Sequence, residues 1–130
     1  MPKILYVEDN EMNRDMLTRR LVRQGFEMFT AVTGPEGVTM AEEVMPDLIL
    51  MDVELGDEKM NGWDAATLIK GRASTAAIPI MALTAHALTS DLDKSIEIDC
   101  CDADTKPIDL ARLLAKINAI LDGRSTAQAA

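Results

Sequence analysis

The sequence predicts an α/β fold in which a parallel sheet carries helices on both faces. Short apolar runs alternate with segments whose apolar residues recur at helical spacing, and this unit repeats five times along the 130 residues. The third run, Leu48–Met51, is apolar on both faces, which is typical of a central parallel strand. A chain of this length forms about one domain with a single core.

The first two strand–helix units occupy residues 4–46. A strand is expected at Ile4–Val7, followed by a helix over residues 10–24. A second strand is expected at Phe26–Val32. The next helix should begin at residues 33–36, Thr-Gly-Pro-Glu, which resemble a capping box with proline in the first turn. It should end at Pro46.

The third strand leads into a loop, residues 53–61, that is rich in Gly, Asp, Glu and Lys. A helix should then run from Gly62 to about Arg72, and a fourth strand is expected at Ile78–Leu83. The fourth helix is marked by apolar residues at i, i+4 spacing: Leu88, Leu92 and Ile96.

The last unit differs from the others, because the short polar stretch Asp102–Thr105 stands where a fifth strand is expected. Pro107 should start the last helix, whose apolar stripe ends at Leu121. Residues 123–130 have the composition of a flexible C-terminal tail, so we expect the domain to cover residues 1–122.

The chain has 13 Lys and Arg against 22 Asp and Glu, a formal net charge of −9. A negative field of this size argues against docking on nucleic acid or anionic membranes. No apolar run approaches a membrane span, and the N-terminus does not resemble a signal peptide. Cys100 and Cys101 are adjacent, which favours free thiols in a reducing cytoplasm. We therefore expect a cytoplasmic protein without membrane insertion.

Polar residues stand where the predicted strands end. They are Glu8 and Asp9 after the first strand, Asp52 after the third, Thr84 and Ala85 after the fourth, and Lys106 after the fifth. Ligands of such sheets bind beyond the carboxyl ends of the strands. Three carboxylates, a hydroxyl and an ammonium group should therefore meet at one edge of the sheet, which we call the rim.

This set of groups suits phosphoryl chemistry. Carboxylates held together repel, and one would stay protonated unless a cation joins them. Mg²⁺ prefers a few carboxylates together with water and phosphate oxygens. A carboxylate beside Mg²⁺ can attack a phosphoryl donor, and a lysine and a hydroxyl can bind the oxygens of the acyl phosphate. Each acid alone has a plainer explanation as a turn or cap residue, so the prediction rests on the whole set.

Four segments resemble the response-regulator receiver domain, the CheY-like family, over about residues 2–121. They read ILYVEDNEMNRDML, PDLILMDVEL, IPIMALTAHA and TKP. The resemblance implies a flavodoxin-like, doubly wound sheet of five parallel strands in the order 2-1-3-4-5, with five helices. The opening VEDNEMNRDML is most similar to that of stand-alone DivK-type single-domain response regulators and of the receiver modules of hybrid kinases.

The resemblance also implies a phosphoacceptor and a metal site. Asp52 is implied to accept a phosphoryl group from a histidine kinase or a His-phosphotransfer protein. Glu8, Asp9, Asp52 and the backbone carbonyl of Glu54 are implied to hold Mg²⁺, directly or through water.

The other rim residues are implied to bind the phosphoryl group and to tune its lifetime. Thr84 would swing toward the group, small Ala85 would leave room for that movement, and Lys106 would pair with it. Glu54 and His86 occupy the family's variable positions, which tune dephosphorylation. His86 also has a plainer explanation as a solvent-facing residue in the first turn of a helix.

Two stretches depart from the family pattern. The family usually has an aromatic residue three positions before the lysine and an aliphatic residue after it, whereas Cys101–Lys106 has no aromatic and is one residue short. This weakens the expectation of the family's usual output coupling. The loop between Asp52 and Gly62 is two residues longer than usual. Its segment Gly56–Asn61 either gates the site or contacts a partner, or is an indifferent insertion.

We expect a phosphorylation-dependent switch or relay, not an enzyme, with slow self-dephosphorylation at most. The sequence contains no effector domain, so its output would be binding to a downstream protein target or onward phosphotransfer. The alternative is a phosphorylation-independent interaction module that keeps the receiver fold, which the altered fifth segment favours. A Mg²⁺-dependent phosphohydrolase is disfavoured because such enzymes place a second catalytic Asp two residues after the first, where this chain has Glu54.

Overall fold

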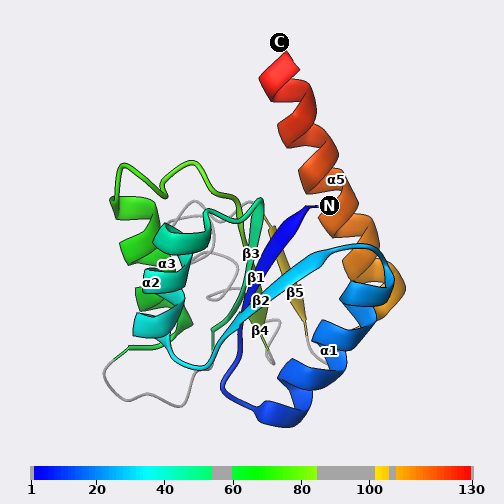
Figure 1. Cartoon of the computed structure of the whole chain (residues 1–130), viewed down its shortest axis with the longest axis horizontal. Helices are drawn as coiled ribbons and strands as arrows, with labels where there is room; N and C mark the ends of the chain where they lie inside the picture. The colour runs from blue at the N-terminus through cyan, green and yellow to red at the C-terminus, as the bar shows by residue number, and fades with distance from the viewer. Residues whose placement is uncertain (1, 54–59, 85–101, 106–107, 130) are drawn as a thin grey trace.

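The computed structural model describes residues 2–53, 60–84, 102–105 and 108–129. Its strands are β1 (Lys3–Val7), β2 (Glu27–Ala31), β3 (Leu48–Asp52), β4 (Ile80–Thr84) and β5 (Asp102–Thr105). They form one sheet in the order β2-β1-β3-β4-β5, with every neighbouring pair parallel (Figure 1). The predicted flavodoxin-like order is thus confirmed, and all carboxyl ends lie at one edge of the sheet.

The helices of the described part are α1 (Glu11–Arg23), α2 (Gly34–Val44), α3 (Gly62–Gly71) and α5 (Leu110–Ala129). Figure 1 shows α1 and α5 on one face of the sheet and α2 and α3 on the other. The fourth helix, expected around Leu88, Leu92 and Ile96, lies outside the described residues. None of the helices that can be described is long and apolar enough to cross a membrane.

The sheet separates two halves of the core. Successive residues of a strand point to opposite faces, so Leu5 and Val7 pack with α2 and α3, whereas Ile4 and Tyr6 pack with α1 and α5. Every residue of β3 is buried. This confirms that Leu48–Met51 belongs to a central strand.

Side-chain caps explain where two helices begin. Thr33 precedes α2, and its hydroxyl accepts a hydrogen bond from the amide of Glu36 at 3.2 Å. Asn61 precedes α3 and forms a complete capping box with Asp64, in which each side chain accepts from the other residue's amide. These bonds satisfy amides that have no partner inside the helix. The start of α3 at Gly62 agrees with the sequence prediction.

The fourth strand is displaced from its expected range. We predict Ile78–Leu83, whereas β4 runs from Ile80 to Thr84. The amide of Ile78 donates to the carbonyl oxygen of Thr75 at 3.0 Å, so this residue still belongs to the preceding turn. Pro79, which follows it, has no N–H to offer to a strand pair.

The last helix begins and ends at later residues than the sequence predicts. It begins at Leu110, three residues after Pro107, because the side chain of Asp109 caps it by accepting from the amide of Arg112 at 3.2 Å. It continues to Ala129, so the backbone of residues 123–129 is helical. Figure 1 shows this end projecting away from the sheet. A domain boundary at 122 and a flexible tail stay predictions.

Candidate functional site

Three carboxylates meet where β1 and β3 end. Glu8 and Asp9 directly follow β1, and Asp52 is the last residue of β3, its neighbour in the sheet. One carboxylate oxygen from each residue lies within 4.8 Å of the other two. Glu8 and Asp52 are buried, with 1% and 2% of their surface exposed, whereas Asp9 is exposed. The acids that the sequence places on one rim are therefore neighbours in space.

Glu8 is held by three neighbouring side chains. The hydroxyl of Tyr6 donates to its Oε2, and the side-chain amide of Asn13 donates to its Oε1, each at 3.4 Å. The guanidinium group of Arg14 donates to its main-chain oxygen at 2.9 Å. Contacts from β1 and α1 thus fix the direction of this carboxylate.

The Tyr6 phenol is a permanent donor in this arrangement. Burial raises the pKa of Tyr6 well above its usual range, and the negative charges of Glu8 and Asp52 raise it further. The phenol therefore stays protonated at neutral pH. Tyr6 and Asn13 were not among the predicted site residues, although Tyr6 stands two residues before Glu8, near the end of β1, and this spacing was an available signal.

The N-terminus of α3 lies against the end of β3. The amide of Gly62 donates to the carbonyl oxygen of Val53 at 3.3 Å. A Cβ atom at Gly62 would overlap the carbonyl oxygen of Asp52 and would lie 2.5 Å from the Cα of Val53. Only glycine permits this approach, which brings the positive end of the α3 dipole beside Asp52.

Thr84 is the last residue of β4 and lies at the same edge of the sheet. It is buried, and its strand is in register with β3 such that Leu83 faces Asp52. Thr84 itself pairs with Thr105, the last residue of β5. The predicted switch hydroxyl is therefore one residue beyond the sheet partner of Asp52.

Several predicted site residues fall outside the part of the chain that the structure describes. They are Glu54, Ala85, His86 and Lys106, together with residues 56–59 of the long loop and the cysteines Cys100 and Cys101. Their expected roles stay predictions.

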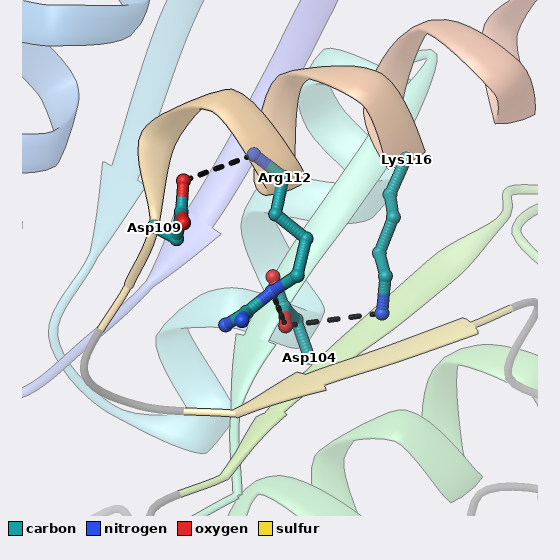
Figure 2. A network of polar contacts seen from close by, with 4 residues as sticks. All are labelled: Asp104, Asp109, Arg112 and Lys116. Atoms are coloured by element: carbon teal, nitrogen blue, oxygen red, sulfur yellow. Dashed lines mark hydrogen bonds and ion pairs between the residues drawn. The ribbon is translucent and has the colours of Figure 1, made fainter.

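The fifth strand carries a buried charge that sequence reasoning did not select. Asp104 is 4% exposed, and its Oδ1 accepts from the Nε of Arg112 at 2.8 Å (Figure 2). The Nζ of Lys116 lies 3.8 Å from the same oxygen. The sequence signal for this contact was an acid in the position of this strand that is usually aliphatic. Two bases, one helical turn apart, follow it on the next helix.

The donor atoms of the rim suit a hard divalent cation. All three belong to carboxylates, the ligand type that Mg²⁺ and Ca²⁺ prefer. Two of these carboxylates are buried beside each other, and a cation would relieve their repulsion. The arrangement therefore combines a cation site with a carboxylate, Asp52, that can act as a nucleophile.

Comparison with protein families identifies a receiver domain. The model of the response regulator receiver domain matches residues 4–118. Protein PilH of Pseudomonas aeruginosa is 33% identical over 123 residues, which are 95% of this chain and 100% of PilH. The polar-differentiation response regulator DivK of Brucella anthropi is 32% identical over 122 residues, with 93% of this chain and 98% of DivK covered.

Other relatives are longer than this chain. The DNA-binding dual master transcriptional regulator RpaA of Synechocystis is 31% identical over 121 residues, which are 93% of this chain and 49% of RpaA. Against the hybrid signal transduction histidine kinase G of Dictyostelium discoideum, 38% identical, the match covers 89% of this chain and 3% of the kinase. The chain thus spans about half the length of RpaA and a small part of the kinase.

Solved structures share the fold. The receiver domain of the sensor histidine kinase PA1611 of Pseudomonas aeruginosa, solved with a magnesium ion coordinated in its active-site cleft, has a TM-score of 0.84 and 30% identity. The match covers 93% of this chain and 98% of that one. A CheY-like receiver domain protein of Methanospirillum hungatei has a TM-score of 0.88 and 26% identity, with 98% of each chain covered.

Proposed function

The chain belongs to the response regulator receiver domain family, and from this membership we propose that it accepts a phosphoryl group on Asp52 in a Mg²⁺-dependent reaction. It then signals by binding a downstream protein or by passing the phosphoryl group on. The donor is a histidine kinase or a His-phosphotransfer protein. We also propose a cytoplasmic location, which the adjacent Cys100 and Cys101 support.

One observation carries the proposal. Glu8, Asp9 and Asp52 have carboxylate oxygens within 4.8 Å of one another, and two of these residues are buried. Glu8, Asp9 and Asp52 would hold Mg²⁺, with the backbone carbonyl of Glu54 as a further ligand. The bound ion would supply positive charge that stabilises the transferring phosphoryl oxygens.

The reaction is a phosphoryl transfer between two protein side chains. A carboxylate oxygen of Asp52 attacks the phosphorus atom, an O–P bond forms, and the P–N bond of the donor phosphohistidine breaks. The electron pair of that bond returns to the imidazole nitrogen, so the products are an aspartyl phosphate and a histidine. Burial of Asp52 limits the access of water to the acyl phosphate.

The remaining rim residues bind and tune the product. Thr84, at the end of β4, donates a hydrogen bond to a phosphoryl oxygen, and Ala85 leaves room for its approach. Lys106, which follows β5, supplies a positive charge. Glu54 and His86 influence the access of water and so the lifetime of the phosphoryl group. The chain is a phosphoacceptor with slow self-dephosphorylation at most, not a turnover enzyme.

Intact-mass spectrometry tests the proposal. The wild-type protein is incubated with Mg²⁺ and acetyl phosphate beside Asp52→Asn and Glu43→Gln. The expected result is an adduct of about 80 Da, the mass of a phosphoryl group, in the wild type and in Glu43→Gln but not in Asp52→Asn. Glu43 is a matched control because it is an exposed acid on α2, away from the rim.

The same experiment separates the alternatives. No adduct in the wild type with acetyl phosphate or with a competent kinase would instead support the phosphorylation-independent interaction module. That alternative is favoured by the altered fifth segment, which lacks the aromatic residue that the family pattern places three positions before Lys106. Sustained phosphate release over many turnovers would indicate a phosphohydrolase.

A further inference from the structure

Asp104 is a buried carboxylate that the proposed phosphoryl transfer does not use. It lies on β5, and its contacts join this strand to α5 (Figure 2). The nearer contact is to Arg112 at 2.8 Å and the farther to Lys116 at 3.8 Å. A carboxylate with 4% exposure is costly to bury without such partners, so the two bases are part of what allows Asp104 to occupy this position.

The strand that carries Asp104 is short and has one neighbour in the sheet. β5 has four residues, lies at the edge of the sheet and pairs with β4 alone in the described order. Two of its four residues are aspartates, which are disfavoured in strands. Apolar packing of the usual aliphatic residue is replaced here by a pair of charged contacts.

The helix that carries the two bases is firmly anchored. Leu113 and Ile117 of α5 are fully buried and pack in the core with Tyr6 of β1. Arg112 and Lys116 each precede one of these residues, so their side chains project from a helix whose position is fixed. The charged contacts therefore hold β5 in place relative to α5.

The end of β5 adjoins the proposed reaction site. Thr105 follows Asp104 and pairs with Thr84, and Lys106 is the next residue of the chain. We propose that Asp104, Arg112 and Lys116 act as positioning residues that fix the end of β5, and so the point from which Lys106 extends, for the reaction on Asp52. This inference rests on the proposed function.

The affinity for Mg²⁺ and the rate of phosphorylation should respond differently to the loss of the Asp104 contacts. Glu8 and Asp9 follow β1 and Asp52 ends β3, so we expect binding of Mg²⁺ not to depend on β5. Phosphoryl transfer should depend on the bound Mg²⁺ and also on the position of β5. Loss of the Asp104 contacts should therefore slow phosphorylation while leaving the affinity for Mg²⁺ nearly unchanged.

Asp104→Asn removes the charge and keeps the shape, and Arg112→Gln removes the nearer partner. Arg72→Gln is the matched control, because the Arg72 side chain is 43% exposed against 45% for Arg112. Its 2.7 Å ion pair with Glu42 joins the residue that follows α3 to α2, on the other face of the sheet. Calorimetric titration gives the Mg²⁺ affinity, intact mass gives the rate of adduct formation with acetyl phosphate, and hydrogen exchange reports the backbone amides of residues 102–105.

Asp104→Asn is expected to lower the rate of adduct formation by about tenfold or more, the scale at which misplacement of a group affects a reaction. Arg112→Gln should have a smaller effect in the same direction, so the test stands even if Asp104→Asn fails to fold. Both variants should speed exchange in residues 102–105 and keep the Mg²⁺ affinity within about twofold of the wild type. Arg72→Gln should change none of these.

Two results would overturn the inference. One is a folded Asp104→Asn or Arg112→Gln protein that is phosphorylated at the wild-type rate. The other is an equal loss of Mg²⁺ affinity and rate, which would indicate general loosening of the fold. Failure of the proposed function has a different signature, because the wild type itself would then form no adduct.

Discussion

The first residue of α3, Gly62, lies directly against the backbone of Asp52. The Gly62 amide donates to the carbonyl oxygen of Val53 at 3.3 Å, and a side chain at position 62 would overlap the Asp52 carbonyl oxygen. The capping box of Asn61 and Asp64 fixes the start of the helix at this point. The geometry around the proposed phosphoacceptor therefore depends on a position that carries no functional group.

Gly62→Ala should destabilise the protein, because the new Cβ meets backbone atoms that cannot move aside. We expect a loss of at least about 2 kcal/mol in the free energy of unfolding, measured by urea denaturation. Gly71→Ala is the matched control at the other end of α3, since a Cβ there meets nothing within 4 Å. It should be neutral or slightly stabilising. Equal stability of the two variants would contradict the close approach.

Tyr6→Phe should weaken the binding of Mg²⁺ by several-fold, because Glu8 loses the donor that directs its Oε2. Stability should fall by only about 1 kcal/mol, the usual worth of one hydrogen bond. Calorimetric titration with Mg²⁺ measures the first quantity and urea denaturation the second. Tyr6 is also the chain's one tyrosine, so a near-ultraviolet difference spectrum on adding Mg²⁺ reports its hydroxyl directly. Unchanged affinity in Tyr6→Phe would show that the phenol does not position Glu8.

The Tyr6 phenol should also make the protein less stable in alkali. Its pKa is raised in the folded state, so the contribution of Tyr6 is fully present below the ordinary tyrosine pKa of about 10 and is lost as the pH rises above it. The wild type should lose up to about 1.4 kcal/mol per pH unit more than Tyr6→Phe in that range. Urea denaturation at a series of pH values checks this, and parallel curves for the two proteins above about pH 10 would refute it.

Mg²⁺ should raise the melting temperature of the protein, because it binds the folded carboxylate cluster and not the unfolded chain. Asp9→Asn should remove most of this shift. Asp9 is exposed, so its substitution leaves the core intact. Glu43→Gln should keep the whole shift, and a chelator should abolish it in every variant. An undiminished shift in Asp9→Asn would exclude this residue from the metal site.

Local patterns in the sequence predict the parallel α/β sheet and the meeting of Glu8, Asp9 and Asp52, since buried strands are continuous apolar runs and parallel strands end at one edge. The strand order is implied by the resemblance to the receiver family and does not follow from these patterns. The contacts of Tyr6 with Glu8 and of Asp104 with Arg112 were not predicted. The contact between Asp104 and Arg112 depends on which side chains of β5 and α5 face each other, and spacing along the chain does not determine this. Tyr6 and Glu8 are two residues apart, so spacing places both on one side of the chain, but it does not show that the phenol reaches the carboxylate.

Element limits were less predictable for a related reason. β4 begins at Ile80 because a turn retains Ile78, and α5 begins at Leu110 because Asp109 caps it. In both places one hydrogen bond, from the Ile78 amide to Thr75 or from the Arg112 amide to Asp109, marks the boundary of the element, and the sequence pattern is compatible with more than one first residue. The choice of Pro107 as the first helical residue relied on the general preference of helices for proline in the first turn.

The most direct measurement of the central claim is the site of the phosphoryl adduct. Wild-type protein is treated with acetyl phosphate, with Mg²⁺ or with excess chelator, and is digested and sequenced by tandem mass spectrometry. We predict one adduct per chain, on Asp52, that forms with Mg²⁺ and not with the chelator. An adduct on another carboxylate, or one that forms equally well in the chelator, would contradict a metal-dependent phosphoacceptor at Asp52.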